Sequence, residues 1–542
     1  MVDTKTREPL WLRATWLTVP LALMVAFAWA SYQRRYILLN PWGDNWVHLT
    51  YIRATIAHGW FPGDAFYGGP HTPPYYCLAD IVLAGVCALT GQPPHVVWLA
   101  LPPVIAVTTM AAIFVWLRAL TGDDRIAVIG AATEMLVSVP DQTWTAMPLP
   151  RTLAVAPLAL GLYCYLRGCR AREWPWLIAA GIALGVSLAT HLFVGGAGLL
   201  SLGALDLSLN WPRRRPSREL AIVATLGLTL ATPWIANVAI GWLHRAPTSA
   251  KVFTITPEVL TLPLGPMSLR LHHPLAVLNV LPSAVWLPVA LGVGLTLWRC
   301  HEGRARVVDR YVLIATAGAL IILFTPFYGL LLAIAGVWTA RVVQVVPLSL
   351  LAGIGIVGGF DRLRSSTRLG RLRIVATTVG VLLVAFVVWS VTGNIRAGVG
   401  GTGWGYFTQG PLGDWNLVDK IAQTGPVPRV VLSDPWTSYL LPYYVGCSVL
   451  VMPAMHGSAY EDHLTREQAA GRVFRPRTPI AEVRRTLDEY QIDALAIARN
   501  QPWPQAGDAD DLLVRLRRHP AFLDTGCCDQ FVLLRYLPQG ES

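Results

Sequence analysis

Apolar segments long enough to cross a lipid bilayer recur along most of this chain, and they constrain its fold more than any other feature. About 20 apolar residues cross the hydrocarbon core of a membrane. Charged residues make up 14% of the 542 residues, compared with about 25% in soluble domains. The composition excludes a soluble enzyme and a disordered chain. The predicted spans are residues 11–31, 93–118, 126–140, 152–168, 174–190, 193–209, 220–242, 275–299, 311–327, 343–360 and 374–392.

Arginine residues in short loops predict how the chain crosses the membrane. The net charge is +11, and lysine occurs only at positions 5, 251 and 420. Positive charge in short loops between spans is typical of cytoplasmic loops, so it needs no nucleic-acid partner. We predict a multi-pass protein of the cell (inner) membrane, with a cytoplasmic N-terminus and an extracytoplasmic C-terminal domain. The basic loops contain Arg167, Arg170 and Arg172; Arg213, Arg214, Arg215 and Arg218; Arg299, Arg304, Arg306 and Arg310; and Arg362, Arg364, Arg368, Arg371 and Arg373.

Two apolar segments near the N-terminus allow a structure other than an ordinary transmembrane span. Residues 10–32 lack a small-residue cleavage site and are long enough to span, so they predict a first transmembrane helix rather than a cleaved signal peptide. Residues 75–91 are short and contain Asp80, which predicts a juxtamembrane, re-entrant or half-depth helix. The predicted fold class is mainly α, a polytopic transmembrane helix bundle of about 11–13 spans with a small C-terminal domain.

The C-terminal segment has a different composition. Short β-like runs predict strands at 430–434, 449–453, 493–498 and 531–537, and helix-like runs predict helices at 464–472, 479–490 and 508–518. This alternation predicts a small α/β domain with a mostly parallel sheet. The predicted organisation is therefore a transmembrane bundle over 1–392, which includes the outer loop 32–75, a glycine-rich linker over 393–405, and an extracytoplasmic α/β domain over 406–542.

Cysteines and aromatic residues in that segment leave two questions open. The eight cysteines include no CxxC pair, so neither a zinc ribbon nor a thioredoxin-like site is indicated. Cys447 could pair with Cys527 or Cys528 in an oxidising compartment. The aromatic side chains form either a surface for stacking sugars or the core of a small domain; they are Trp404, Tyr406, Trp415, Trp436, Tyr443 and Tyr444.

The first predicted outer loop gathers polar and aromatic residues directly after the first span. Asp44 and His48 are four residues apart and therefore share a face on a helix, and Arg53 follows them. Asp44 lies where apolar chain meets water, a place where burial can tune a carboxylate for work as a base. The structural alternatives are that Asp44 caps a helix starting near Asn45 and that the aromatic residues form an interfacial belt.

A first span followed at once by a long outer loop with the pattern D-x-x-x-H resembles the GT-C superfamily of membrane glycosyltransferases, including bacterial protein mannosyltransferases and aminoarabinose transferases. GGPHTPPYYCLADIVLAGVCALTG after the loop, ATHLFVGG at 189–196 and VWTARVVQVVPLSLLAG at 337–353 are similar to segments of that family. The segment LSDPWTSYLLPYYVGCSVLVMPAMHGSAYEDHLTR looks like the extracytoplasmic domain of many bacterial members. The resemblance therefore implies a GT-C-like bundle with an appended outer domain.

The resemblance also implies a function. It implies an enzyme that moves a hexosyl or pentosyl group from a polyprenyl-phosphate sugar lipid to a glycan, lipid or protein acceptor on the extracytoplasmic face, with inversion as the usual outcome. Carried over by position, Asp44 is the catalytic base and Asp141 is a second catalytic acidic residue, although DQ replaces the family's acidic pair there. Arg341 matches an arginine that would clamp the lipid phosphate; the alternative is a snorkelling interfacial arginine.

Further polar residues complete the predicted site. His48, Arg53, His71, Arg151 and His191 join Arg341 as predicted substrate-binding residues. His191 stands between two apolar runs, where a polar ring marks either a functional site at membrane depth or a short outer turn. Adjacent histidines at 272 and 273 seldom both bind one ion, so no metal ligand is assigned. The family includes metal-dependent and metal-independent enzymes, which leaves a divalent metal open as a cofactor.

Other functions use the same kind of scaffold. A transporter or flippase for a lipid-linked saccharide would need charged or broken helices at mid-depth, and Glu134 is the main such charge in the predicted spans. A non-catalytic scaffold in envelope glycan assembly and a polysaccharide polymerase or ligase also remain alternatives. The sequence has no P-loop and no GxGxxG between a strand and a helix, which favours a lipid-linked donor over a nucleotide sugar.

Overall fold

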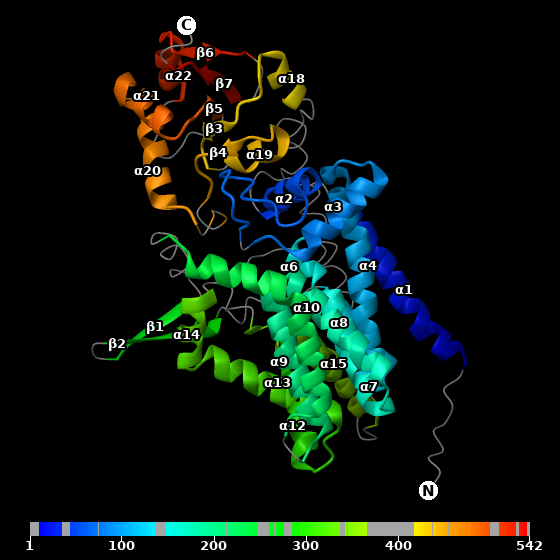
Figure 1. Ribbon diagram of the computed structural model, residues 1–542. Helices are drawn as coiled ribbons and strands as arrows, with labels where there is room; N and C mark the ends of the chain where they lie inside the picture. Colours follow the sequence, from blue (N-terminus) through cyan, green and yellow to red (C-terminus); the bar gives the residue numbers. More distant parts are fainter. Residues whose placement is uncertain are drawn as a thin grey trace. The chain divides into compact units, whose positions relative to one another are not determined.

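The computed structural model describes most of the chain, and contacts within the chain divide it into two compact units (Figure 1). Unit 1 comprises residues 1–35, 100–233 and 254–398, and unit 2 comprises residues 36–99, 234–253 and 399–542. The predicted span 374–392 and linker 393–405 lie outside the described residues. The residues left undescribed are 1–9, 35–43, 74, 136–147, 213–214, 247–258, 265–266, 276–284, 336–341, 344, 366–416, 436, 454–455, 457, 459, 476, 499–508, 527–530 and 539–542.

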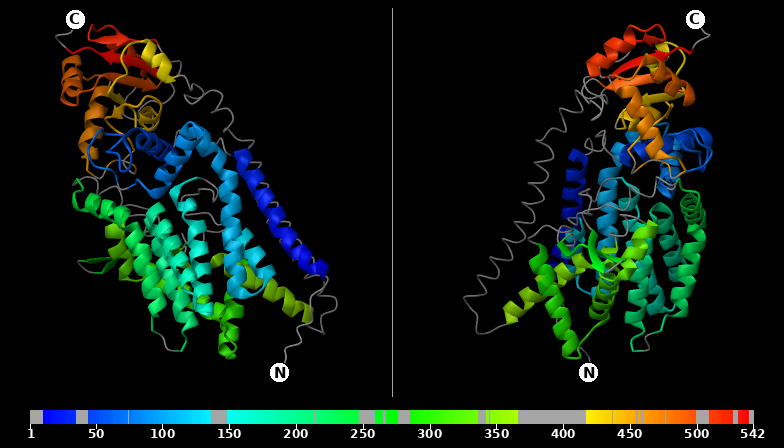
Figure 2. Two further views of the ribbon diagram at one scale, coloured as in Figure 1. Left: turned by 45° about the vertical axis from the view of Figure 1, so that its right-hand side comes forward. Right: turned by 90° about the vertical axis from the view of Figure 1, so that its left-hand side faces the viewer.

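Unit 1 is a helix bundle with one β-hairpin. Its antiparallel hairpin pairs β1 (Val259–Leu264) with β2 (Met267–His272). Helices α7, α8 and α9, drawn in cyan to green, pack side by side in the views of Figure 2. The helices of this unit are α1 (Leu10–Arg34), α4 (Pro94–Thr121), α5 (Asp124–Glu134), α6 (Pro150–Leu153), α7 (Val155–Ala171), α8 (Trp174–Thr190), α9 (Leu192–Leu209), α10 (Arg218–Leu243), α12 (Trp286–His301), α13 (Val307–Leu323), α14 (Pro326–Ala335) and α15 (Leu348–Ser365), with α4 starting and α10 ending in the ranges of unit 2.

Hydropathy and length identify spanning helices in this bundle. Among the described residues, four helices are long and apolar enough to cross a membrane, or five if α13 and α14 together count as one span. The four are Pro94–Thr121, Pro150–Ala171, Leu192–Leu209 and Arg218–Leu243. The mainly helical membrane bundle predicted from the sequence is therefore confirmed.

Glycines explain how the backbones of α12 and α15 approach each other so closely. A Cβ atom added at Gly292 would overlap the carbonyl oxygen of Leu351, and one added at Gly355 would overlap that of Pro288. Small residues at helix contacts are typical of membrane bundles, where close packing rather than water exclusion holds helices together.

Three local features of unit 1 differ from the sequence prediction. The predicted span 311–327 is broken, because α13 ends at Leu323, Pro326 starts α14, and the two helices meet at 70°. Proline lacks the amide hydrogen that a continuous helix needs at that point. The described helix covers only residues 126–134 of the predicted span 126–140, because α5 begins at Asp124 and ends at Glu134. The β-hairpin lies between the predicted spans 220–242 and 275–299, where no strand was predicted.

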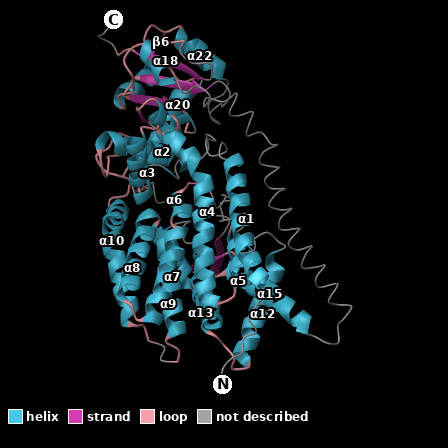
Figure 3. Cartoon of the chain, turned by 90° about the vertical axis from the view of Figure 1, so that its right-hand side faces the viewer, coloured by secondary structure: helices cyan, strands magenta, loops and turns pink. Residues whose placement is uncertain are grey.

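Unit 2 contains a five-stranded sheet whose order is β4-β3-β5-β7-β6. The strands are β3 (Val430–Ser433), β4 (Ser448–Val449), β5 (Ala494–Ala498), β6 (Phe522–Asp524) and β7 (Phe531–Tyr536), shown in magenta in Figure 3. Strand β3 is parallel to β4 and β5, but β7 is antiparallel to β5 and β6. The sheet is therefore mixed rather than mostly parallel, and β6 was not predicted.

Helices of the C-terminal segment cover this sheet and build its core. They are α18 (Leu417–Gln423), α19 (Leu441–Tyr444), α20 (His463–Phe474), α21 (Ile480–Glu489) and α22 (Ala509–Arg517), with a 3₁₀ turn at Thr437–Tyr439. Apolar side chains of α20, α21 and α22 form one buried cluster with those of the strands. Helices α20 to α22 begin and end within two residues of the predicted ranges.

The predicted outer loop folds into the same unit as the C-terminal segment. It forms α2 (Asp44–His58), and α3 (Leu78–Thr90) follows it. The 13 residues of α3 give a length of about 20 Å at 1.5 Å per residue, too short to cross a 30 Å core. The amide of Val449 donates to the carbonyl oxygen of Phe66 at 2.6 Å, so the loop pairs with edge strand β4.

Candidate functional site

Asp44 is the first residue of α2, and its carboxylate contacts a histidine of the C-terminal segment. The Oδ1 atom of Asp44 pairs with Nε2 of His456. The Asp44 side chain keeps 28% of its surface exposed, whereas the His456 side chain keeps 5%. The carboxylate is thus held by a buried ring while part of its surface remains exposed.

The other nitrogen of the His456 ring is also occupied. Nδ1 of His456 is hydrogen-bonded to the hydroxyl of Tyr439, and the ring of Tyr75 packs edge-on at 5.5 Å between centroids. Burial, and then the nearby charge of Asp44, raise the pKa of Tyr439 well above its ordinary value. This hydroxyl therefore stays protonated and has a hydrogen available for the hydrogen bond to His456.

Sheet topology explains why Tyr439 and His456 meet. Strands β3 and β4 are parallel neighbours, and each of the two residues follows the carboxyl end of one of them. After β3, the carboxylate of Asp434 accepts the amide of Thr437 at 2.9 Å and so starts the turn that carries Tyr439. The carboxyl ends of parallel strands are the usual place for a binding site in an open α/β sheet.

His48 has a partner of its own, although it shares a helix with Asp44. Its Nδ1 lies 2.9 Å from Oδ1 of Asp80, and both side chains are almost fully buried. The other Asp80 oxygen accepts the amide of Cys77 at 3.0 Å and its thiol at 3.4 Å. His48 therefore joins α2 to the start of α3.

Among the described residues, His48, Cys77 and Asp80 form a group whose residue types could hold a metal ion. One ligand atom from each lies within 4.8 Å of the others. Both oxygens of Asp80 are nevertheless already engaged by the other two residues. The donor set is satisfied internally, so its geometry fits a structural hydrogen-bond network better than a metal site.

Arg53 and His71 contact the C-terminal segment as well. Arg53 donates from Nη1 to the carbonyl oxygen of Tyr443, and Gly446 leaves room for the guanidinium, because a Cβ there would lie 2.8 Å from Nη2. The ring of exposed His71 lies 4.8 Å from that of Tyr460, between centroids. Arg53 thus fixes a backbone turn, and His71 is the more accessible of the two.

Tyr443 and Tyr444 belong to the core. Their side chains are 6% and 5% exposed, and the ring of buried Trp46 lies 5.6 and 5.4 Å from theirs. Of the two predictions for the aromatic residues, the core of a small domain is therefore confirmed for this pair.

A polar cleft of about 440 Å³ lies between the outer loop and the C-terminal strands within unit 2. The guanidinium carbon of Arg466 lies 4.8 Å from the ring centre of Tyr67 and 6.0 Å from that of Tyr490. Arg466 also pairs with Glu461 at 2.6 Å. Residues lining the cleft include Tyr67, Gly68, Arg429, Ser448, Arg466, Glu489, Tyr490 and Gln491.

Unit 1 places two predicted residues in different settings. Arg151, in α6, is 3% exposed and lines a cavity of about 160 Å³ together with Glu134 and Tyr311. His191 joins α8 to α9, and its Nδ1 accepts the amide of Val194 at 3.2 Å. His191 therefore lies at the break between two helices and caps the second of them, and its role in substrate binding stays a prediction.

Several of the remaining predicted residues lie outside the part of the chain that the structure describes. Asp141 and Arg341 lie outside the described residues, as do Cys527 and Cys528, the predicted partners of Cys447. Nδ1 of His272 faces the carbonyl oxygen of His273 at 3.0 Å. His456 and Tyr439 were not predicted, although both follow predicted strands.

Comparison with known proteins identifies similar folds only at the level of structure. No family model and no curated protein sequence matches the chain. The archaeal oligosaccharyltransferase AglB from Archaeoglobus fulgidus, in complex with an inhibitory peptide and a dolichol-phosphate, aligns with a TM-score of 0.57 and 13% identity over 90% of this chain and 70% of its own. A structure of the Archaeoglobus fulgidus oligosaccharyltransferase with Zn and sulfate aligns at 0.51, with 13% identity over 88% of this chain and 68% of its own.

Two bacterial proteins are similar as well. ArnT from Cupriavidus metallidurans in the apo state aligns with a TM-score of 0.54 and 14% identity, over 97% of this chain and 98% of its own. Its complex with undecaprenyl phosphate aligns at 0.52, with 16% identity over 96% and 98%. The arabinofuranosyltransferase AftD from Mycobacteria aligns at 0.56, with 12% identity over 96% of this chain and 40% of its own.

Proposed function

We propose that this chain, which has the fold of the GT-C membrane glycosyltransferases, transfers a sugar from a polyprenyl-phosphate carrier to an acceptor on the extracytoplasmic face. Asp44 is the general base of the proposal, and inversion at the anomeric carbon is the expected outcome. The observation that carries it is the Asp44 carboxylate, held by a buried histidine and still partly exposed. A base must reach the acceptor hydroxyl and remain ionised, and a hydrogen bond to a carboxylate favours its charged form.

Arg151 supports the lipid-phosphate part of the proposal. A buried guanidinium on a small cavity is suited to a phosphate, because its fork of donors matches the phosphate oxygens. The names of two similar structures include dolichol-phosphate and undecaprenyl phosphate. We assign Arg151 and Arg341 to the lipid phosphate, Asp141 to a second acidic role, and His71 and Arg53 to the edge of the substrate site.

The cleft at Arg466 supports the acceptor part of the proposal. Tyrosine faces, guanidinium groups and a carboxylate are the groups with which proteins bind hydroxyl-rich rings. We assign this cleft to a glycan acceptor. Tyr490→Ala is expected to raise the KM for the acceptor and leave the KM for the donor unchanged. The control is Arg485→Ala, at an exposed residue of helix α21, which ends just before Tyr490.

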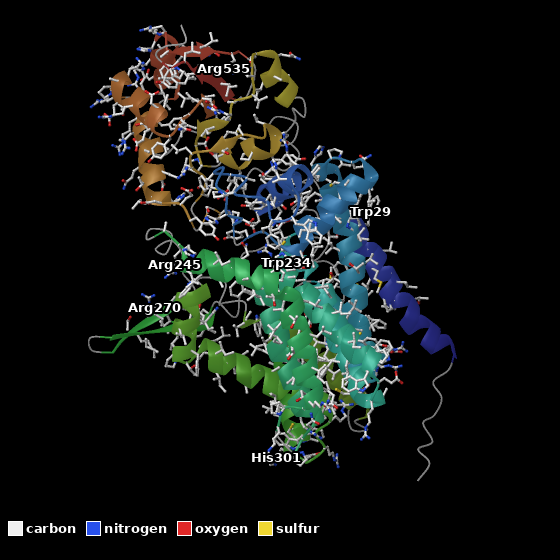
Figure 4. The ribbon with its side chains drawn as sticks, viewed as in Figure 1. Trp29, Trp234, Arg245, Arg270, His301 and Arg535 are labelled. Carbon is white, nitrogen blue, oxygen red and sulfur yellow. The ribbon has the colours of Figure 1, made fainter. Side chains whose placement is uncertain are left out.

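The proposed orientation rests on where charge and loops gather. In unit 1 the ends of α7 and α12 that precede basic loops lie at one end of the bundle, with His301 at that end and Trp29 toward the other (Figures 1 and 4). The outer loop and the C-terminal segment belong to one unit, as expected if both lie on one side of the membrane. We place the basic end in the cytoplasm and unit 2 outside.

Transfer from a panel of radiolabelled polyprenyl-phosphate sugars, in membranes that contain the protein, tests the proposal. Asp44→Asn keeps the size of the side chain and removes the base, so we expect transfer to fall at least about 100-fold. Asp524→Asn, at an exposed ion pair in the same unit, is the control. Equal rates for wild type and Asp44→Asn would refute the role of Asp44.

The same experiment separates the other functions. If the wild type transfers no sugar from any donor while a known GT-C enzyme does so in the same membranes, the transferase proposal fails. Movement of the labelled lipid across the bilayer would then indicate the transporter, and absence of both activities the scaffold. Products that carry several sugars would indicate a polymerase.

A further inference from the structure

The contact between Asp44 and His456 joins two parts of the chain that lie almost at its opposite ends. An ionised carboxylate only accepts hydrogen bonds, so Nε2 of His456 must carry a proton to bind Asp44. Nδ1 of a neutral ring is then an acceptor, and the Tyr439 hydroxyl donates to it. With the ring neutral, the chain of hydrogen bonds runs from Tyr439 through His456 to Asp44, and a ring protonated on both nitrogens would still hold Asp44 through Nε2.

This arrangement is more constrained than a surface ion pair. The His456 side chain is 5% exposed, Tyr439 is fully buried, and Tyr75 packs against the ring from the outer loop. Both ring nitrogens have partners from different segments, so rotation of the ring would break two hydrogen bonds at once. Such a histidine holds its partner in one orientation.

We propose that His456, with its ring oriented by Tyr439, is a positioning residue that fixes the Asp44 carboxylate for the transfer reaction. The inference rests on the proposed function and adds that the C-terminal domain supplies part of the catalytic centre. As the acceptor oxygen forms its bond to the anomeric carbon, the acceptor O–H proton passes to the Asp44 carboxylate. The bond from the anomeric carbon to the lipid phosphate oxygen breaks, its electron pair leaves with the polyprenyl phosphate, and His456 keeps its Nε2 proton.

The first experiment measures kcat and the donor KM of the full chain in lipid nanodiscs. His456→Ala is expected to lower kcat about 10–100-fold, the usual effect of losing a group that orients a reacting one, and to change the KM for the donor by less than about twofold. His456→Gln should recover part of kcat, because its amide nitrogen can donate from about the position of Nε2. Tyr439→Phe should lower kcat less than His456→Ala does.

A matched control separates positioning from a general loss of folding. His463 is a second buried histidine of the same domain, and its Nε2 lies 3.7 Å from Glu467. His463→Gln should leave kcat unchanged. An unchanged kcat in His456→Ala, or equal losses in His456→Ala and His463→Gln, would overturn the inference.

A second experiment needs no enzymatic activity. In ¹⁵N-histidine NMR spectra, with His456→Gln used to assign the signal, the ring proton should lie on Nε2, and the signal should move in Asp44→Asn. Thermal unfolding of Asp44→Ala, His456→Ala and the double variant should be non-additive, whereas Asp44→Ala combined with His463→Gln should be additive. A proton on Nδ1 alone, or an additive Asp44–His456 cycle, would overturn the placement of His456.

The two experiments distinguish the inference from the function on which it rests. A wild type that transfers no sugar overturns the proposed function and, with it, the role given to His456 in catalysis. An active wild type with an additive cycle overturns only the role of His456.

Discussion

Replacing Asp80 with alanine tests whether the network of His48, Cys77 and Asp80 is structural. Asp80 is 1% exposed, and the change leaves the Nδ1 group of His48 and the amide of Cys77 buried without their acceptor. Each such group costs about 1–3 kcal/mol, so we expect a loss of about 3 kcal/mol. For a domain of 150–250 residues this lowers the melting temperature by about 6–12 °C.

Thermal unfolding of the full chain in detergent, followed by size-exclusion chromatography after heating, measures the loss. The control is Asp524→Ala, which removes an exposed pair with Arg517 at 2.6 Å and should cost less than about 1 kcal/mol. The wild type is also heated with and without EDTA. Because both Asp80 oxygens already have partners, the chelator should leave its melting temperature unchanged.

Two results would refute this reasoning. If Asp80→Ala has the same melting temperature as the wild type, the network does not stabilise unit 2. If EDTA lowers the melting temperature of the wild type but not of Asp80→Ala, and zinc restores it, then the three residues bind a metal and our assignment of the group as a hydrogen-bond network is wrong.

Three further predictions concern other parts of the chain. Gly355→Ala should destabilise the bundle by about 1–3 kcal/mol, because the added Cβ meets the Pro288 carbonyl oxygen. Gly359→Ala is the control and should be neutral, because a Cβ there has nothing within 4 Å. Equal melting temperatures of the two variants would contradict this prediction. Burial raises the pKa of Asp64, so the protonated side chain contributes stability at low pH, and this contribution is lost as the pH rises through that pKa. The melting temperature of Asp64→Asn should therefore rise relative to that of the wild type between pH 4 and pH 7. Parallel curves of melting temperature against pH would refute this prediction. Burial raises the pKa of Cys447 to about 12, so in reduced protein at pH 8 a maleimide should label it only after denaturant is added, as mass spectrometry of the peptide would show.

Local patterns predicted most elements of the C-terminal domain, because periodicity and capping are properties of adjacent residues. The range predicted for β3 differs from the observed strand by one residue at most, and the amphipathic helix α21 by one residue at each end. Strand direction is a different kind of information. Strand β7 runs antiparallel to β5, and nothing in an alternating or apolar run specifies which way the chain returns to the sheet. The prediction of a mostly parallel sheet was wrong for that reason.

The candidate site shows the same division between local and distant information. Asp44 stood out because it begins a D-x-x-x-H pattern in the outer loop that follows an apolar span, and this pattern is visible within a few residues. His456 has no local signal of that kind, since a histidine after a strand can lie in a core or on a surface. Its role depends on the pairing of β4 with β3, which also determines where Tyr439 lies.

One contact explains how the outer loop reaches that end of the sheet. Strand β4 is the edge of the sheet, and an edge strand leaves backbone groups that another segment can pair with. The loop uses this edge, because the amide of Val449 donates to the carbonyl oxygen of Phe66. Gly68 keeps the loop close, with positive φ and with Ser448 Oγ 3.0 Å from where a Cβ would lie. The edge pairing thus brings the loop that carries Asp44 against the strand that leads to His456, so a substitution that weakens the pairing should lower transfer without touching either residue.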